Sequence, residues 1–357
     1  MRVVPLLMRS GFGRSMRISR LLPFPLWLVR AVSNIALFLG IFVGVLNSSQ
    51  VLASDGSYLD RDDVTDWVKE TVAETDLDIE YVRSQLALAT RQEKVLERIS
   101  APAEKTLTWG EYRKIFIQQK RIAAGREFLD ENRALFKQAE ERFGVPSAVV
   151  AAIIGVETFY GRYKGKDQAL SALATLAFDY PRRGKFFQRE LREFLLLAQE
   201  ESFEPADIRG SYAAAMGMPQ FISSSYRSYA VDFDGDGRRD LWESKADIIG
   251  SVANYLATHG WVKDEPVAEQ VRPDGKAYRK LIAKKLLPEL RRKQLHAAGV
   301  KTKASSVKEK SLMELQAVDG KQVWVGFHNF YVITRYNRSR LYALAVHELS
   351  KALNEKS

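Results

Sequence analysis

Ala148-Val-Val-Ala-Ala-Ile-Ile-Gly-Val156 is a run of nine residues without a polar side chain, and Glu157 follows it directly. A helix that is apolar on every face must be surrounded by protein, because none of its sides can face water at low cost. The run therefore predicts a buried helix over residues 147–160 in a globular core. On such a helix Glu157 shares a face with Val150 and Ile153, so its carboxyl group is expected in apolar surroundings.

Removal from water disfavours the charged form of a carboxyl group, which raises its pKa and lets it donate a proton near neutral pH. Glu157 is therefore a candidate general acid. The structural alternative is a buried glutamate paired with an arginine, such as Arg162 or a distant one, because buried ion pairs also perturb titration. The spacing alone favours neither.

The composition is that of an ordinary globular protein. The chain has 357 residues, of which 46% are hydrophobic and 27% charged, which excludes disordered, collagen-like and coiled-coil classes. It has no cysteine, which excludes disulfides, thiolate metal sites, cysteine nucleophiles and lipid attachment to cysteine. The formal net charge is +10, but six arginines lie within residues 1–53, so the charge does not indicate a nucleic-acid partner.

Residues 1–53 have the pattern of an export signal. An arginine-containing start precedes an apolar run over residues 36–46, and Val51-Leu-Ala53 supplies a small residue for cleavage. Eleven apolar residues are fewer than the roughly 20 that span a bilayer as a helix. The alternative is an uncleaved anchor lengthened by Leu26-Trp-Leu-Val29, which Arg30 interrupts. Either way, the rest of the chain is expected to face an extracytoplasmic compartment.

The rest of the chain is predicted to be mainly helical. Residues 58–143 have helical spacing, with one long amphipathic run from Trp109 to Phe143. Two more helices are expected between residues 170 and 203, separated at Tyr180-Pro181, and others over residues 248–259 and 339–353.

Residues 272–310 differ, with thirteen lysines or arginines against three acidic residues. Strand-like segments at 267–271 and 322–325 flank this stretch and suggest a small inserted α+β subdomain. Its charge is explained equally by attraction to an anionic polymer and by a plain solvated surface.

The segment from Asp232 to Glu243 has the spacing of a calcium-binding loop. Asp232, Asp234, Asp236 and Asp240 occupy positions one, three, five and nine, Gly237 occupies position six, and Glu243 occupies position twelve. Carboxylates this close repel one another unless a cation lies among them. Position eight is Arg239 instead of an apolar residue, so a structural calcium ion is expected and not a signalling pair of helices.

Two further segments offer polar groups for a ligand. The loop over residues 210–225 is rich in small residues, and Ser211 and Gln220 could supply hydrogen bonds to a ligand. The same composition is equally explained by a loop whose small residues only allow close packing of the backbone. Arg182 and Arg183 form either a clamp for a carboxylate or a solvated pair. The four histidines have no ligand spacing, and the sequence lacks a phosphate-binding glycine loop, a G-x-S-x-G elbow and an H-E-x-x-H motif.

Several of these segments, in this order, resemble the lytic murein transglycosylase B family over roughly residue 60 to the C-terminus. The segments are Ile153-Ile-Gly-Val-Glu157, Ala172–Leu176, Tyr180–Arg183, Gly210–Ala213, Ala215–Gly217, Pro219–Phe221, Ser224–Tyr226, Val231–Trp242, Ser251–Tyr255 and Asn329–Asn337. The resemblance implies a mainly α (α+β) fold with a lysozyme-like core. It implies a helical domain over 58–145, a core with the calcium loop over 146–262, a small basic insertion over 263–325, and a C-terminal part of the core over 326–357.

The resemblance also implies roles for individual residues. Glu157 matches the single catalytic acid/base of the family, and Arg182 and Arg183 match a pair near the peptide stem of the substrate. Residues that match the lining of the saccharide cleft are Ser211, Gln220, Tyr255, Tyr336 and Asn337, with Tyr342 as a weaker match. Residues that match the Ca²⁺ ligands are Asp232, Asp234, Asp236 and the Arg238 carbonyl, with Asp247 as the last ligand; the general calcium-loop rule gives Glu243 in place of Asp247.

The expected reaction follows from the resemblance. It is cleavage of the β-1,4 bond between N-acetylmuramic acid and N-acetylglucosamine in peptidoglycan, with closure of the C6 hydroxyl on C1 to a 1,6-anhydro end and no organic cofactor. Two alternatives remain, a non-catalytic peptidoglycan-binding module and a lysozyme-type hydrolase with two carboxylates. Expected partners are the glycan strands, with cell-wall synthesis proteins as further candidates, and the chain is expected to be an exported monomer that binds no nucleic acid.

Overall fold

The structure is a computed structural model that describes residues 57–100, 107–283, 285, 287–304 and 309–355. Of Glu309 only the backbone is described. The expected export signal over residues 1–53 lies outside these ranges, as do parts of the basic segment. Within them, no helix combines the length and the apolar character that crossing a membrane requires.

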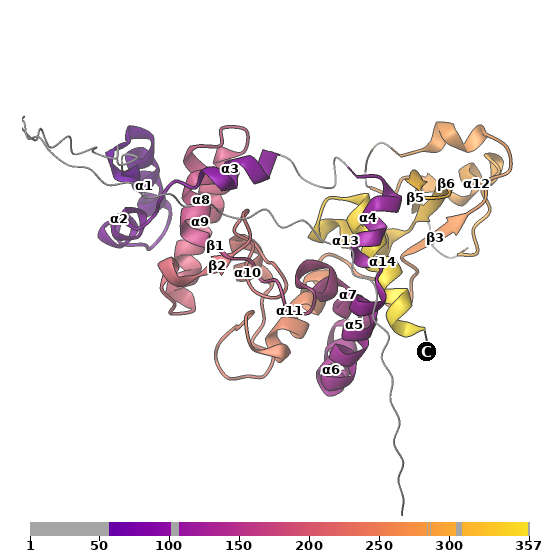
Figure 1. The fold of residues 1–357 in the computed structure, drawn as a ribbon, viewed down its shortest axis with the longest axis horizontal. Coiled ribbons are helices and arrows are strands. Elements are labelled where there is room, and N and C mark those ends of the chain that lie inside the picture. The colour runs from indigo at the N-terminus through magenta and orange to yellow at the C-terminus, as the bar shows by residue number, and fades with distance from the viewer. Residues whose placement is uncertain (1–56, 101–106, 284, 286, 305–308, 356–357) are drawn as a thin grey trace, which may run out of the picture. The chain divides into compact units, whose positions relative to one another are not determined.

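Most of the described chain is helical, which confirms the class predicted from the sequence (Figure 1). The α-helices are α1 (Asp62–Glu74), α2 (Ile79–Ala87), α3 (Glu93–Ser100), α4 (Trp109–Phe116), α5 (Gln119–Glu131), α6 (Arg133–Phe143), α7 (Ser147–Thr158), α8 (Ala169–Phe178), α9 (Gly184–Glu200), α10 (Ser223–Tyr229), α11 (Lys245–Thr258), α12 (Arg292–Ala297), α13 (His328–Tyr336) and α14 (Arg340–Asn354). Short 3-10 turns are η1 (Tyr58–Asp60), η3 (Pro205–Asp207) and η4 (Ala277–Leu281).

The N-terminal helices pack on the helix pair α8 and α9. The ring of Phe178, at the end of α8, lies 5.7 Å from both the Tyr58 and the Trp67 ring. Arg192 of α9 forms an ion pair with Glu74 of α1, and α3 contacts α8. Residues 57–100 therefore fold onto a part of the chain that comes much later in the sequence.

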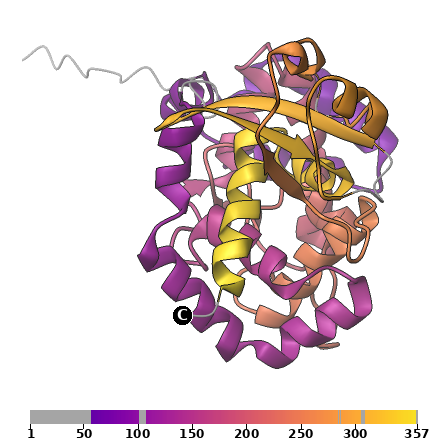
Figure 2. The ribbon, with the colours of Figure 1, turned by 90° about the vertical axis from the view of Figure 1, so that its right-hand side faces the viewer.

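Helix α7 is the buried centre of the fold. Every residue from Ala148 to Val156 is buried, and α7 packs against α5, α6, α11 and α14. The C-terminal helix α14 contacts α4 and α5 as well as α7, as can be followed in Figure 2. The all-apolar run therefore forms the predicted buried helix, which ends at Thr158 and not at Tyr160. Helices α5 and α6 before it in the sequence, and α11 and α14 after it, surround it.

The long amphipathic run from Trp109 to Phe143 folds as three helices and not as one. The backbone leaves the helical region at Ile117 and Gln118, and again at Asn132, which ends α5 and begins α6. A straight helix of 35 residues would be about 50 Å long, too long to stay in contact with one short buried helix. The two breaks let α4, α5 and α6 bend around α7 and α14.

A four-stranded antiparallel sheet interrupts the helical fold, in the order β3-β6-β5-β4. Its strands are β3 (Ala268–Val271), β4 (Leu290–Arg291), β5 (Glu309–Ala317) and β6 (Gly320–Gly326), and a separate two-stranded pair is formed by β1 (Asp167–Gln168) and β2 (Arg209–Gly210). Side chains alternate between the faces of a strand. Leu312 and Val325 lie in a small separate core, whereas Met313 and Trp324 belong to the main core. The sheet thus joins two apolar clusters.

His347 of α14 lies against Trp324 of β6, with the two rings edge to face at 6.2 Å. Burial, and secondarily the charge of Lys351, lowers the pKa of His347 from 6.5 to about 4. Because the folded-state pKa is the lower one, the unfolded chain binds this proton first as the pH falls. The contribution of His347 to the free energy of unfolding is therefore fully present above pH 6.5. It is lost as the pH falls toward 4, by at most about 1.4 kcal/mol per pH unit.

We expect His347→Phe, which keeps a ring against Trp324, to lose less stability than the wild type between pH 7 and 4.5. Urea unfolding at both pH values measures the difference. The exposed His296 supplies the control, because His296→Gln is expected to retain the wild-type pH dependence. An equal loss in the wild type and His347→Phe would contradict the assignment.

Candidate active site

Glu157 lies in the last turn of α7 and is half-buried, although the apolar residues before it are buried. The hydroxyl of Tyr342 donates a hydrogen bond to its Oε1 atom over 2.6 Å. Tyr342 is 2% exposed and lies in the first turn of α14, where the Ser339 hydroxyl accepts from its backbone N–H. The two residues are 185 positions apart, so the α7–α14 contact brings them together.

A cluster of aromatic rings extends from this pair. The Tyr336 ring stacks on Tyr342 at 6.4 Å and also contacts Tyr255 at 4.7 Å and Phe221 at 5.7 Å. The Tyr336 hydroxyl donates to the Pro219 carbonyl over 2.6 Å. Helices α11, α13 and α14 and the loop before α10 therefore meet at Glu157.

The tyrosine hydroxyls of this cluster are neutral hydrogen-bond donors. Burial raises the pKa of Tyr342 and of Tyr336 well above the usual value, and the negative charge of Glu157 adds to the rise. Burial likewise raises the pKa of Tyr255, whose hydroxyl donates to the Arg335 carbonyl over 2.7 Å. The His259 ring stacks on Tyr255 at 4.1 Å. The sequence assigned His259 no role, and here it supports one of the expected site residues.

Ser211 and Gln220 lie on the small-residue loop and hold its backbone. The Ser211 hydroxyl oxygen accepts from the N–H groups of Ala213 and Ala215. The Gln220 amide donates to the carbonyls of Lys164 and Gly217. Both side chains are half-buried, so they fix the shape of the loop beside the aromatic cluster.

The other expected ligand-binding residues lie in different places. Asn337 is half-buried and directly follows Tyr336 at the end of α13. Arg182 and Arg183 are exposed on the turn between α8 and α9, not on the elements that carry Glu157 and Tyr342. The Arg183 guanidinium lies 4.1 Å from the Phe186 ring centroid.

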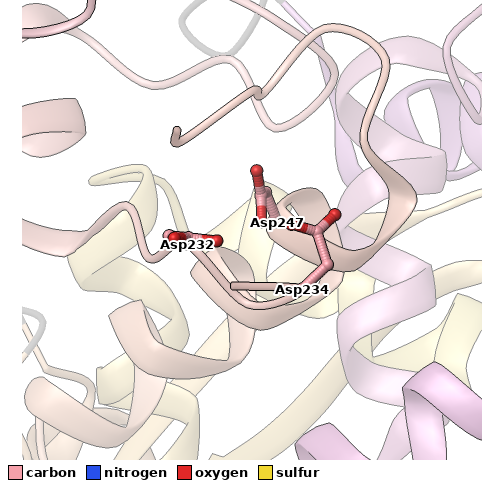
Figure 3. Close-up of side chains that lie close together, drawn as sticks. All are labelled: Asp232, Asp234 and Asp247. Carbon is pink, nitrogen blue, oxygen red and sulfur yellow. The ribbon is translucent and has the colours of Figure 1, made fainter. Parts of the chain in front are cut away.

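The aspartates of the calcium-like loop form a separate group. Ligand oxygens of Asp232, Asp234 and Asp247 all lie within 4.8 Å of one another, and Figure 3 shows the three side chains together. Asp247 is fully buried at the start of α11, and its two oxygens accept from the N–H groups of Phe233 and Asp240, each over 2.7 Å. Burial raises the pKa of Asp247, with the charges of Asp234 and Asp232 as further causes.

This donor set fits a hard divalent cation. Such ions prefer carboxylate oxygens, and a buried carboxylate beside two others is stabilised by a nearby positive charge. Asp236 and Arg238 are exposed on the same loop, where the Asp236 side chain accepts from the Arg238 N–H over 2.9 Å. The alternative last ligand, Glu243, is 74% exposed at its side chain and pairs with Lys164 over 2.7 Å.

The structure gives roles to two residues of this region, Ser244 and Arg239, that the sequence did not assign. The Ser244 hydroxyl donates to Asp234 over 2.8 Å and accepts from the Asp247 N–H, a cap that the Ser-x-x-Asp spacing of residues 244–247 could have indicated. Arg239, the unusual residue at position eight, pairs with Glu200 and Glu201 at the end of α9. A charged residue there attaches the loop to α9, as an apolar residue could not.

Comparisons with known proteins agree on one relationship. A protein-family model described as Transglycosylase SLT domain matches residues 60–351. Membrane-bound lytic murein transglycosylase B of Escherichia coli (strain K12) is 38% identical over 320 residues, which are 85% of this chain and 86% of that protein.

Solved structures extend the same relationship to the fold. Soluble lytic transglycosylase SltB1 from Pseudomonas aeruginosa has a TM-score of 0.78 and 42% identity, covering 82% of this chain and 98% of that one. The Escherichia coli lytic transglycosylase Slt35 in complex with calcium has a TM-score of 0.76 and 38% identity, covering 84% and 94%.

Proposed function

Since the chain belongs to the Transglycosylase SLT domain family and is a lytic murein transglycosylase, a lyase that acts on peptidoglycan, we propose that Glu157 is its single catalytic acid and base. The bond cleaved is the β-1,4 linkage between N-acetylmuramic acid and N-acetylglucosamine, and the product carries a 1,6-anhydro end. The observation that carries this assignment is the half-buried carboxyl group of Glu157 at the end of an apolar helix, held by Tyr342.

The proposed reaction needs one carboxyl group that acts twice. Glu157 first gives its proton to the glycosidic oxygen, and the C1–O4 bond breaks while the N-acetyl carbonyl stabilises the positive charge at C1. The Glu157 carboxylate then accepts the proton of the C6 hydroxyl as that oxygen bonds to C1. The proton count balances, no water is consumed, and the attack within one sugar is fast because its nucleophile is already in place.

Most glycosidases use a second carboxylate as nucleophile or base. The other conspicuous carboxylates of this chain, Asp232, Asp234 and Asp247, accept hydrogen bonds from backbone amides or a serine hydroxyl of their own region. Their engagement there supports the single-carboxylate mechanism over the lysozyme-type alternative.

The surrounding residues orient Glu157 and the substrate. The Tyr342 hydroxyl donates to one Glu157 oxygen and so fixes the orientation of the carboxyl group. Ser211, Gln220, Tyr255, Tyr336 and Asn337 are proposed to line the saccharide site, and Arg182 and Arg183 to meet carboxylates of the peptide stem. We assign Tyr342 to the catalytic carboxyl group more than to the sugar.

Asp232, Asp234, Asp236, the Arg238 carbonyl and Asp247 are proposed to hold Ca²⁺. The ion would neutralise their combined charge and so fix the loop before α11, the helix that carries Tyr255. This role is structural.

The remaining assignments are proposals of the same kind. The domain limits are those given by the sequence, with a helical domain at 58–145, the core at 146–262 and 326–357, and the basic insertion at 263–325. The protein is proposed to be an exported, periplasmic monomer that acts on glycan strands, with cell-wall synthesis proteins as candidate partners.

The products of one digestion test this function. We expect purified murein sacculi to release soluble muropeptides that are about 18 Da lighter than hydrolysis products, because no water is added. Mass spectrometry of the soluble fraction measures this. Reducing ends of full mass would instead support the two-carboxylate hydrolase, and sedimentation of the protein with sacculi without soluble products would support a binding module.

A further inference from the structure

The segment after Glu157 turns back on itself at the end of α7. Phe159, Tyr160 and Gly161 all have positive φ values, of 51°, 57° and 86°. This reversal brings the backbone N–H of Tyr163 to the carbonyl of Thr158 over 3.0 Å. Tyr163 therefore lies at the same end of α7 as Glu157, the residue that precedes Thr158.

The turn is fixed to its surroundings by hydrogen bonds. The Thr158 hydroxyl donates to the Met218 carbonyl over 2.9 Å and accepts from the Gly161 N–H over 3.1 Å. The Gln220 amide donates to the Lys164 carbonyl over 3.1 Å. These contacts join the turn to the loop that carries the expected saccharide-binding residues, and they hold the backbone of Tyr163 in one place.

The Tyr163 ring is nevertheless exposed to solvent. Its exposed fraction is 69%, and it is the one aromatic residue among the exposed large apolar side chains of the described ranges. The ring of Phe159 lies 6.3 Å from it, and the guanidinium groups of Arg121 and Arg162 lie 4.7 and 4.9 Å from the Phe159 centroid. Tyr163 thus has the buried ring of Phe159 beside it, while most of its own surface faces water.

An exposed aromatic ring on a fixed backbone is a surface on which the apolar face of a sugar can stack. Binding to a side chain whose backbone is already fixed loses little conformational entropy. A glycan strand bound across Glu157 continues in both directions beyond the sugars that flank the cleaved bond. We propose that Tyr163 forms an outer subsite that binds a further sugar ring of the peptidoglycan strand, an inference that rests on the proposed function of Glu157.

The test compares a long and a short substrate. We expect Tyr163→Ala to raise the KM for murein sacculi about three- to tenfold, with kcat changed less than about twofold, because the lost stacking affects binding of the strand and not the chemistry. A soluble tetrasaccharide-peptide, which has too few sugars to reach an outer subsite, is expected to be cleaved with a KM within about twofold of wild type. Initial rates on both substrates give these values.

Two further variants are matched controls. Tyr163→Phe keeps the ring and is expected to behave as the wild type. Val318→Ala truncates a residue that is 64% exposed on the turn between β5 and β6, and it is expected to change neither substrate's kinetics.

An unchanged KM for sacculi in Tyr163→Ala would overturn the subsite. An equal loss on both substrates would also overturn it, since that result indicates a structural role at the end of α7. The masses of the wild-type products, recorded in the same digestions, report separately on the Glu157 mechanism. Reducing-end products of full mass would contradict the Glu157 mechanism, and the KM values for the long and the short substrate could still be compared.

Discussion

Glu157→Gln is expected to reduce the release of soluble muropeptides from sacculi by roughly 1,000-fold or more, because an amide can neither give nor take the proton that the reaction needs. Glutamine has nearly the same shape and keeps an oxygen that can accept from the Tyr342 hydroxyl. Folding and binding to sacculi are therefore expected to persist. Sedimentation with sacculi and thermal unfolding measure these two properties alongside product release.

Tyr342→Phe is the matched control for this prediction. It removes one hydrogen bond to Glu157 and leaves the carboxyl group in place, so a loss of only about tenfold is expected. If Glu157→Gln retains release of anhydro products, the proton transfers must be assigned to another group. If Tyr342→Phe loses as much activity as Glu157→Gln, the phenol takes part in the reaction more directly than orientation requires.

Asp247→Asn is expected to lower the free energy of unfolding by about 2–4 kcal/mol, since its buried oxygens accept from two backbone N–H groups. In the variant one oxygen becomes an NH₂ group that faces an N–H donor. Calcium is expected to raise the melting temperature of the wild type and not that of the variant, because a bound ligand stabilises only the fold that can hold it. Thermal unfolding with calcium, and with a chelator, measures both effects.

Glu243→Gln distinguishes between the two candidates for the last ligand. Glu243 is exposed and paired with Lys164, so its loss is expected to cost at most about 1 kcal/mol and to leave the calcium response intact. The assignment of Asp247 would be wrong if Glu243→Gln abolished the calcium response and Asp247→Asn kept it.

The sequence predicts most reliably what depends on local pattern. The all-apolar run identified α7, and its buried position follows from the absence of any polar face. The mainly helical class and the family are confirmed, since the family resemblance rests on long collinear motifs. The breaks at Ile117 and Asn132 escaped prediction, because the amphipathic pattern continues through them and packing around α7 decides where the helix bends.

Contacts between distant segments could not be read from the sequence. The hydrogen bond from Tyr342 to Glu157 spans 185 positions, and only the packing of α14 on α7 reveals it. The choice between Asp247 and Glu243 likewise depends on Lys164, which lies before the loop by about seventy residues and holds Glu243 in an ion pair. Strand β5 was missed because its charged residues interrupt the apolar alternation that marks a strand.

The contact between α7 and α14 has a consequence for when a newly made chain can become active. Synthesis proceeds from the N-terminus, so Glu157 is made 185 positions before Tyr342 and the rest of α14, the helix that packs on α7. A polypeptide that ends before α14 has the proposed acid, Glu157, but not the tyrosine that donates a hydrogen bond to it. Because α14 supplies both the packing on α7 and the Tyr342 hydrogen bond, we expect full activity only after this last helix has folded.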